Sequence, residues 1–348
     1  MAQRPEHAPH PDVTPPQAAA AFLDSPETKV FRVRYTGAPQ QLRHYLLARY
    51  GHGRSASWGE SFYPQRVRLD GLAVDGQTVV QPGQEIAYLH HRADELPMPP
   101  PPVVLHEDDR LLAVHKPDTV PVSPSGVYYF TALVMALREQ HGLPELTPMH
   151  RLDLETSGPI VFAKRRSEVA ALHALFAAGA IHKRYRALAW GHVSVTQREI
   201  AGRIVPDGSS PIQTRLRLVP AQHGAPVSLT RVHAITHQHH PRHGPLSELL
   251  LEPVTGKTNQ LRVHLAAIGH PIVGDKKYHG DPAVFLDWYA HRDFARLRDR
   301  LLLPRQALMC ESLGFPHPFT GEPVRIAAPA DAWTDKLRGL HERAMPPT

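Results

Sequence analysis

The spacing of apolar positions predicts a small mixed domain near the N-terminus. Residues 30–35 alternate apolar and basic side chains with the period of two that is typical of a half-buried strand. Residues 40–50 instead place their apolar side chains at helical spacing. Strand and turn signals follow at 71–77 and 85–89. The pattern therefore predicts one compact domain of short strands and a helix over residues 28–95.

The remainder of the chain is predicted to be rich in strands. Helical periodicity covers residues 131–140 and 167–178, with Ser167 as the expected N-cap of the second helix and Gly179 as its end. The predicted strands cover residues 103–105, 111–114, 159–163, 184–190, 212–219, 228–236 and 246–252. Because these strands follow one another across hairpin-length gaps, we expect an α+β domain. Its sheet would be mixed, mostly antiparallel and flanked by helices.

Proline-rich stretches mark the limits of these domains. Proline and alanine dominate residues 1–27, which are too polar to offset the entropy of ordering and are predicted to be a disordered tail. Residues 96–102 hold five prolines in seven positions, a composition that favours a stiff extended linker. The expected order is thus the tail, the small domain 28–95, the linker 96–102 and a main domain over 103–345.

Composition and charge narrow the class of protein. The 348 residues are 42% hydrophobic and 21% charged, which is ordinary for a globular protein. A net charge of +6 is compatible with a polyanionic partner, although many basic proteins bind no nucleic acid. The single cysteine, Cys310, excludes a disulfide framework and a cysteine-only metal cluster, so we expect a cytoplasmic protein. No run reaches the ~18 apolar residues that a membrane span needs, so we expect no membrane association.

A polar loop between two apolar stretches holds the first candidate for chemistry. Residues 149–158 crowd charged side chains together, end in three turn-forming residues and lead into the strand predicted at 159–163. Loops held by a sheet are where catalytic groups concentrate, which makes Asp153 a candidate. Composition alone favours the plainer interpretation that Asp153 pairs with Arg151 or shapes the turn.

A second polar cluster opens a predicted helix. Thr258 is the expected N-cap, and Leu261 begins an apolar stripe that faces the core. Lys257, Asn259 and Arg262 lie around the helix start, where backbone N–H groups and the helix dipole favour anions. A solvated helix end would show the same residues, so the pattern leaves both interpretations open.

Two further segments, around Tyr185 and at residues 237–243, contain residues that could bind a ligand. Tyr185 lies among basic residues and a histidine at the start of a predicted strand, which suits stacking on a base but also a half-buried amphipathic strand. The histidine-rich stretch 237–243 lies between two predicted strands and lacks a cysteine or carboxylate at metal-ligand spacing. We expect a solvated hairpin loop there and no metal.

Together these segments resemble the RluA-type RNA pseudouridine synthase family. The resemblance covers about residues 103–327, and its motifs occur in the order that the family has them. They lie at residues 112–117 with 120–122, 150–153 with 156–158, 183–187, 256–265 with 269–275 and 278, and 315–322. The sequence departs from the family at Lys257, where Arg is usual, at Asn259, where His is common, and at Met309 and Cys310, which replace His-Ala.

The resemblance implies a pseudouridine synthase fold and a catalytic role for Asp153, which would attack the target uridine or remove a proton from its ribose. A carboxylate in a dry pocket tends to be protonated, and a neighbouring cation opposes this. Arg262 is the expected cation, held against Asp153 by a bidentate pair. Tyr185 would stack on the flipped uracil, and Arg151 would fill the space that the base vacates in the RNA. The other residues expected to bind substrate are His150, Leu261, Lys257, Asn259 and Lys116.

The implied partner is structured RNA, either ribosomal or transfer RNA, and the isomerisation requires no cofactor. The target nucleotide must leave its helix to reach the carboxylate. A monomer is expected. Residues 68–76 and 80–86 resemble, more weakly, the second half of an alpha-L RNA-binding module, so the domain at 28–95 is expected to dock RNA.

Two other functions remain open from the sequence. The chain could be an RNA-binding protein of the same fold without catalysis. It could also be a glycosidic hydrolase that uses Asp153, which would need a second carboxylate at a suitable separation, with Glu155 the nearest in sequence.

Overall fold

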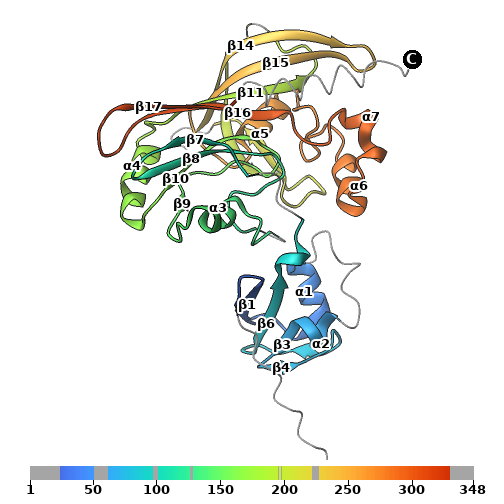
Figure 1. The fold of residues 1–348 in the computed structure, drawn as a ribbon. Helices are drawn as coiled ribbons and strands as arrows, with labels where there is room; N and C mark the ends of the chain where they lie inside the picture. The colour runs from blue at the N-terminus through green and yellow to red at the C-terminus, as the bar shows by residue number, and fades with distance from the viewer. Residues whose placement is uncertain are drawn as a thin grey trace, which may run out of the picture. The chain divides into compact units, whose positions relative to one another are not determined.

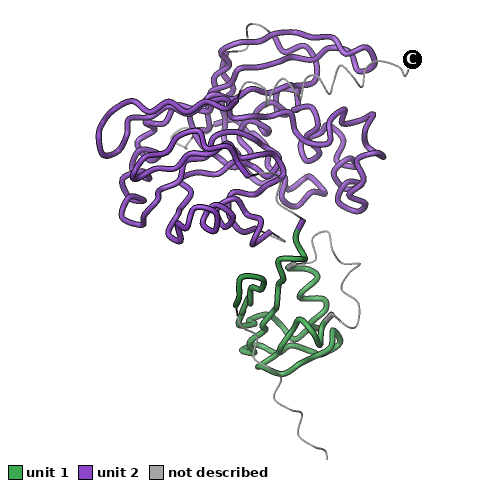
Figure 2. Tube along the Cα trace, viewed as in Figure 1, with its two compact units in different colours: residues 1–95 green, residues 96–348 purple. Residues whose placement is uncertain are grey.

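The computed structural model divides the chain into two compact units, Met1–Glu95 and Leu96–Thr348 (Figure 2). The described residues are 24–329, apart from gaps at 51–61, 97–100, 126–127, 195, 197 and 222–226. Most of the predicted tail, the centre of the predicted linker and the predicted end of the main domain at 330–345 lie outside this part of the chain. Residues 24–27 belong to a turn in which Ser25 bridges to Thr28, so regular structure begins within the stretch predicted to be a tail.

The first unit is a small antiparallel sheet packed against a helix. Its sheet has the strand order β1-β6-β3-β4 (Figure 1). A second strand pair joins β2 to β5. The fully buried Leu42 and Leu46 of α1 pack against the sheet, as their helical spacing predicts. The elements are β1 (Thr28–Arg34), β2 (Gln40–Gln41), α1 (Leu42–Tyr50), α2 (Phe62–Arg66), β3 (Val67–Leu69), β4 (Leu72–Ala73), β5 (Val79–Val80), β6 (Glu85–His91) and η2 (Arg92–Asp94).

Two antiparallel sheets form the frame of the second unit. The smaller has the order β7-β8-β10-β9 and the larger the order β13-β12-β14-β15-β11-β16-β17. Its strands are β7 (Val104–Glu107), β8 (Leu111–Lys116), β9 (Thr147–Pro148), β10 (Gly158–Ala163), β11 (His182–Trp190), β12 (Glu199–Pro206), β13 (Leu216–Val219), β14 (Ser228–His240), β15 (Gly244–Pro253), β16 (Leu308–Pro316) and β17 (Pro323–Ala327). All pairings between these strands are antiparallel, and a parallel bridge from Ser157 to Met309 links the two sheets.

Helices cover both sheets and confirm the predicted α+β class. Figure 1 shows α3 and α4 beside the smaller sheet and α5 beside the larger one. Leu133 and Leu137 of α3 share one core with Phe162 of β10, whereas Leu261 and Leu265 of α5 belong to a second core under the larger sheet. The helices are α3 (Leu133–His141), η3 (Arg166–Glu168), α4 (Val169–Ala177), α5 (Gln260–Ala267), α6 (Ala283–His291), η4 (Ala295–Leu297) and α7 (Arg298–Leu301).

The structure differs from the sequence predictions at Ser167, at residues 199–206 and in the histidine-rich stretch. Ser167 lies inside the 3₁₀ turn η3 and caps nothing; instead the Glu168 carboxylate accepts the backbone N–H of Arg165 at 2.7 Å. The strand β12 was missed because its Gly202 and Pro206 weaken the strand pattern. The histidine-rich stretch is mostly strand, since β14 runs through His240 and leaves residues 241–243 for the turn. The predicted solvated loop is therefore a long hairpin.

Two searches of the described part of the chain bear on membranes and metals. No helix there is long and apolar enough to span a bilayer. No group of three or more His, Cys, Asp or Glu side chains is arranged there to hold a metal ion.

Candidate active site

The polar loop that carries Asp153 is fixed where it enters β10. Gly158 has φ 133, and a Cβ at this position would collide with the carbonyl group of Cys310. The close approach lets the Cys310 N–H donate to the carbonyl oxygen of Ser157 at 2.8 Å. The loop thus lies directly on β16, and glycine at 158 is the condition for that contact.

Lys116 supports the same loop from behind. Its side chain is fully buried, and its ammonium group donates to the carbonyl oxygens of Pro117 at 2.8 Å and Leu154 at 3.0 Å. Leu154 also accepts the N–H of Thr119 at 2.9 Å. The prediction that Lys116 binds substrate therefore conflicts with the structure: its charge is used inside the protein to hold the residue that follows Asp153.

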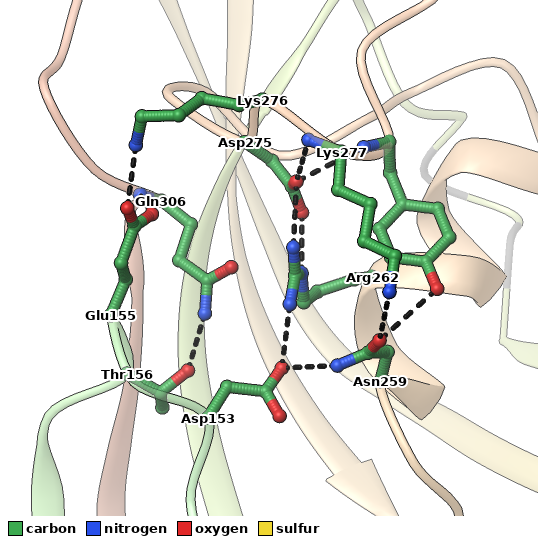
Figure 3. Close-up of polar contacts among 10 residues, drawn as sticks. Asp153, Glu155, Thr156, Asn259, Arg262, Asp275, Lys276, Lys277 and Gln306 are labelled. Atoms are coloured by element: carbon green, nitrogen blue, oxygen red, sulfur yellow. Dashed lines mark hydrogen bonds and ion pairs between the residues drawn. The ribbon is translucent and has the colours of Figure 1, made fainter. Parts of the chain in front are cut away.

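Glu155 and Thr156 tie the other side of the loop to a distant segment (Figure 3). The ammonium group of Lys276 donates to Glu155 at 2.6 Å. Gln306 donates its backbone N–H to Glu155 at 3.2 Å and its side-chain amide to Thr156 at 2.6 Å. Glu155 is therefore a structural anchor and does not line the cavity that Asp153 faces.

The Asp153 carboxylate receives two donors on one oxygen. Oδ2 accepts from Arg262 Nη1 at 2.8 Å and from Asn259 Nδ2 at 2.7 Å (Figure 3). Within the described residues, no donor reaches Oδ1. The side chain is 21% exposed, against 12% for Arg262. One oxygen of Asp153 is thus held in place while the other stays available to a ligand.

Arg262 is anchored by a second carboxylate that the sequence analysis missed. Its Nε and Nη2 donate to Asp275 at 2.6 and 2.9 Å, so the bidentate partner is Asp275 and the contact with Asp153 is single. Burial alone would lower the pKa of Arg262, but the carboxylates of Asp275 and Asp153 outweigh it and raise that pKa. Burial raises the pKa of Asp275, and Arg262 reverses this to a net lowering. The signal in the sequence was Asp275 itself, in the motif that follows α5.

These groups open into one cavity of about 710 Å³ in the second unit. Asp153 is the one carboxylate among the described residues that line it. All the predicted site residues except Lys116 contribute to its wall, namely His150, Arg151, Asp153, Tyr185, Lys257, Asn259, Leu261 and Arg262. Folding thus brings together residues that are more than 100 positions apart in the sequence.

Two aromatic rings in this wall are uncharged. Burial raises the pKa of Tyr185 well above 10, so its hydroxyl keeps its proton. Burial lowers the pKa of His150 to about 3, and its Nε2 accepts the N–H of Val161 at 3.2 Å. The His150 ring lies 5.4 Å from that of Phe176, centroid to centroid. Both rings therefore present neutral faces rather than charges to a ligand.

The start of α5 differs from the prediction. Its N-cap is Asn259, with φ 54 and ψ 22, rather than Thr258. Asparagine adopts this left-handed conformation more readily than other residues with a side chain, except aspartate. The Gln260 side chain accepts the N–H of Lys257 at 3.1 Å, so part of the expected anion site is already satisfied within the protein.

The sequence of the chain is similar to known enzymes. A profile of the RNA pseudouridylate synthase family matches residues 110–267. The dual-specificity RNA pseudouridine synthase RluA of Vibrio vulnificus is 34% identical over 234 residues, 67% of this chain and 84% of that protein. The ribosomal large subunit pseudouridine synthase C of Escherichia coli is 34% identical over 241 residues, 66% of each chain.

A solved structure has the same fold. Human RNA pseudouridylate synthase domain containing 1 superposes with a TM-score of 0.53 at 24% identity, over 73% of this chain and all of that one. The fold is therefore that of the synthases. With the sequence matches over most of each relative, this means that the chain belongs to the RluA-type RNA pseudouridine synthase family.

Proposed function

We propose that this protein converts specific uridines of structured RNA into pseudouridine and that Asp153 is its nucleophile. One observation carries the proposal: Asp153 lies in a cavity with Oδ2 bound by Arg262 and Asn259, while within the described residues no donor reaches Oδ1. Relatives named RNA pseudouridine synthases support the reaction. The size of the cavity, about 710 Å³, is ordinary for a small-molecule or nucleotide site.

The chemistry is an isomerisation. The bond between the ribose and N1 of uracil breaks, the base turns, and a new bond forms from the ribose to C5, which gives up its proton while N1 gains one. No electrons are exchanged with a cofactor. Asp153 acts either by attacking the uridine or by removing a proton from its ribose, and both roles require an ionised carboxylate. Arg262, whose own charge is secured by Asp275, places a positive charge against that carboxylate.

The residues around Asp153 suit a flipped nucleotide. Leaving the RNA helix costs a few kcal/mol, which contacts inside the cavity must offset. Tyr185 offers a neutral ring for stacking, and Leu261 packs the other side of the base. Because its pKa is raised, Tyr185 is a poor proton acceptor at neutral pH, which favours stacking over general-base catalysis. The exposed Arg151 then occupies the vacated space in the RNA.

The RNA itself is proposed to be ribosomal or transfer RNA. One relative is named for the ribosomal large subunit and another for dual specificity. Lys257, exposed at the cavity wall, is suited to a phosphate. We also propose that the unit at 28–95 docks RNA as a separate module beyond the linker 96–102, and that the protein acts in the cytoplasm as a monomer.

Hydrolysis of a glycosidic bond would need a second carboxylate near Asp153, and the described residues of the cavity wall hold none. Glu155 is bound to Lys276 and lies outside the cavity wall. Asp275 is fully buried and gives both of its oxygens to Arg262. Within the described residues, no second acid can therefore activate a water opposite Asp153 in the way that glycosidic hydrolysis needs.

Purified protein and transcribed ribosomal and transfer RNA test the proposal. Asp153→Asn is expected to abolish pseudouridine formation and leave RNA affinity within about threefold, because one carboxylate oxygen is replaced without loss of shape. Asp287→Asn is the matched control, since this partly exposed carboxylate lies on α6 and pairs with Arg296. Turnover by Asp153→Asn would exclude it as the nucleophile. Free uracil as product would favour the hydrolase, and binding without product in the wild type would favour the non-catalytic alternative.

A further inference from the structure

Asn259 is the second donor to Asp153 and holds an uncommon backbone conformation. It lies in the left-handed region at the N-cap of α5, where its carbonyl oxygen accepts the N–H of Val263 at 2.9 Å. Its Nδ2 donates to Asp153 Oδ2 at 2.7 Å. The helix start therefore fixes the point from which the carboxamide reaches the carboxylate.

The neighbours of the Asn259 carboxamide permit only one of its two orientations. Its Oδ1 lies 3.4 Å from the ammonium nitrogen of Lys277, which can only donate, and 3.2 Å from the hydroxyl of Tyr278. Burial raises the pKa of Tyr278 to about 12, so this hydroxyl keeps its proton and can donate. A rotated amide would set its NH₂ group against the Lys277 ammonium and its oxygen against the Asp153 carboxylate. The NH₂ group must therefore face Asp153.

We propose that Asn259 is a positioning residue that selects which oxygen of Asp153 reacts. Arg262 and Asn259 converge on Oδ2 and fix the plane of the carboxylate, which leaves Oδ1 as the oxygen that meets the uridine. Arg262 supplies a positive charge beside Asp153, and Asn259 fixes the orientation of the carboxylate. This inference rests on the proposed function and deepens it, and it moves Asn259 from substrate binding to control of the nucleophile.

Charged groups and a tyrosine also lie near this carboxylate. Arg262 approaches from α5, Lys277 and Asp275 from the segment that follows it, and Tyr185 from β11. Among the described residues, Asn259 supplies the one uncharged donor to Oδ2. Removing its side chain deletes a hydrogen bond to the carboxylate without changing any charge.

Glycine is the informative substitution because of the backbone. Asn259→Gly keeps the left-handed conformation at no steric cost and removes only the carboxamide. Asn259→Asp keeps the shape and tolerates the same conformation but cannot donate when ionised. The matched control is Arg292→Gly, because Arg292 is exposed and caps the end of α6 with φ 54 and ψ 23, nearly the angles of Asn259.

The experiment compares single-turnover pseudouridine formation and RNA dissociation constants of the wild type and these three variants. Asn259→Gly is expected to react roughly 10- to 100-fold more slowly, the range for one hydrogen bond to a charged group. Its RNA affinity should stay within about threefold, because the cavity wall is otherwise intact. Asn259→Asp should be slower still, and Arg292→Gly should match the wild type.

Several outcomes would overturn the inference. Rates within twofold of the wild type for both Asn259 variants would show that Asp153 needs no second donor. Weaker RNA affinity with an unchanged rate would return Asn259 to substrate binding. A wild-type protein that forms no pseudouridine would overturn the proposed function as well, whereas the first two results leave that function standing.

Discussion

Among the described residues, two arginines each lie between two carboxylates, and one of the two lines the cavity. Arg262 contacts Asp153 at 2.8 Å and Asp275 at 2.6 Å. On the larger sheet, Arg186 contacts Glu248 at 3.1 Å and Glu311 at 2.6 Å. The contact distances are similar, so bond length does not distinguish the two groups.

The groups around Arg262 and Arg186 differ in burial. The Arg262 side chain is 12% exposed and that of Asp275 is 0% exposed, whereas the Arg186 side chain is 42% exposed. Water and salt screen the exposed group, so such pairs contribute about 0–1 kcal/mol each. In the buried group, loss of one partner leaves an uncompensated charge, which costs about 3–5 kcal/mol. Contact distance therefore does not identify the functional group, whereas the more buried arginine is the one that lines the cavity.

Asp275→Asn is expected to have the largest effect on the free energy of unfolding and on turnover. An amide cannot accept from both Nε and Nη2 of Arg262, so the free energy of unfolding should fall by about 3–5 kcal/mol. Arg262 should also turn away from Asp153, and pseudouridine formation should fall with it. Urea denaturation measures the first effect and a turnover assay the second. Glu248→Gln is the matched control, because it removes one carboxylate partner of the more exposed Arg186. Equal losses of stability and activity in the two variants would show that the burial of the arginine does not matter.

Arg262→Lys is expected to have the next largest effect. A lysine ammonium cannot span two carboxylates with the planar fork of a guanidinium. The single-turnover rate should drop roughly 100-fold, which corresponds to about 2.7 kcal/mol, while RNA affinity changes little. Arg186→Lys, measured in the same assay, should keep the wild-type rate. A similar loss of rate in both variants would contradict a special role for the buried arginine.

The buried group also gives stability a pH dependence of definite sign. The folded-state pKa of Asp275 is lowered from 3.8, since Arg262 overcomes the effect of burial. A group whose pKa is lower in the folded state contributes stability above its unfolded pKa, and this contribution is lost as the pH falls through the folded value. The stability gap between wild type and Asp275→Asn should therefore be constant from about pH 5 upward and narrow below pH 3.8. Denaturation at a series of pH values checks this, and a gap that widens on acidification would contradict it.

The smallest effect is expected from Arg186→Gln. Its partners Glu248 and Glu311 are partly exposed, at 19% and 28%, so water still reaches them when the guanidinium is removed. The free energy of unfolding should change by less than about 1 kcal/mol, and the change should shrink further at high salt. Activity should be unaffected, because Arg186 does not line the cavity. A loss above about 2 kcal/mol would mean that exposure does not govern these pairs.

Local patterns in the sequence predicted much of the fold. The apolar spacing at Leu42 and Leu46, the alternation in β1 and the hairpin-length gaps between later strands were sufficient for the α+β class. Local signals failed where tertiary contacts decide the outcome. Gly202 and Pro206 obscured β12, which is held by its pairing with β13 and β14.

The candidate site was predictable as a set of residues but not as a geometry. Ordered motifs placed Asp153, Tyr185 and Arg262 together because each lies in a segment that resembles one of the family's motifs. The bidentate pair of Arg262 with Asp275 could not be read from the sequence, since it depends on how the chain returns past α5. The burial of Lys116 could not be read from the sequence either, because its ammonium group is bound by the carbonyl oxygens of Pro117 and Leu154.

The central proposal is that the protein forms pseudouridine in RNA with Asp153 as its nucleophile. Its most direct test is transcriptome-wide pseudouridine mapping in cells that lack this gene, with the gene restored as wild type or as Asp153→Asn. We expect that one or a few ribosomal or transfer RNA sites lose pseudouridine, that the wild type restores them and that Asp153→Asn does not. An unchanged map on loss of the gene, or full restoration by Asp153→Asn, would contradict it.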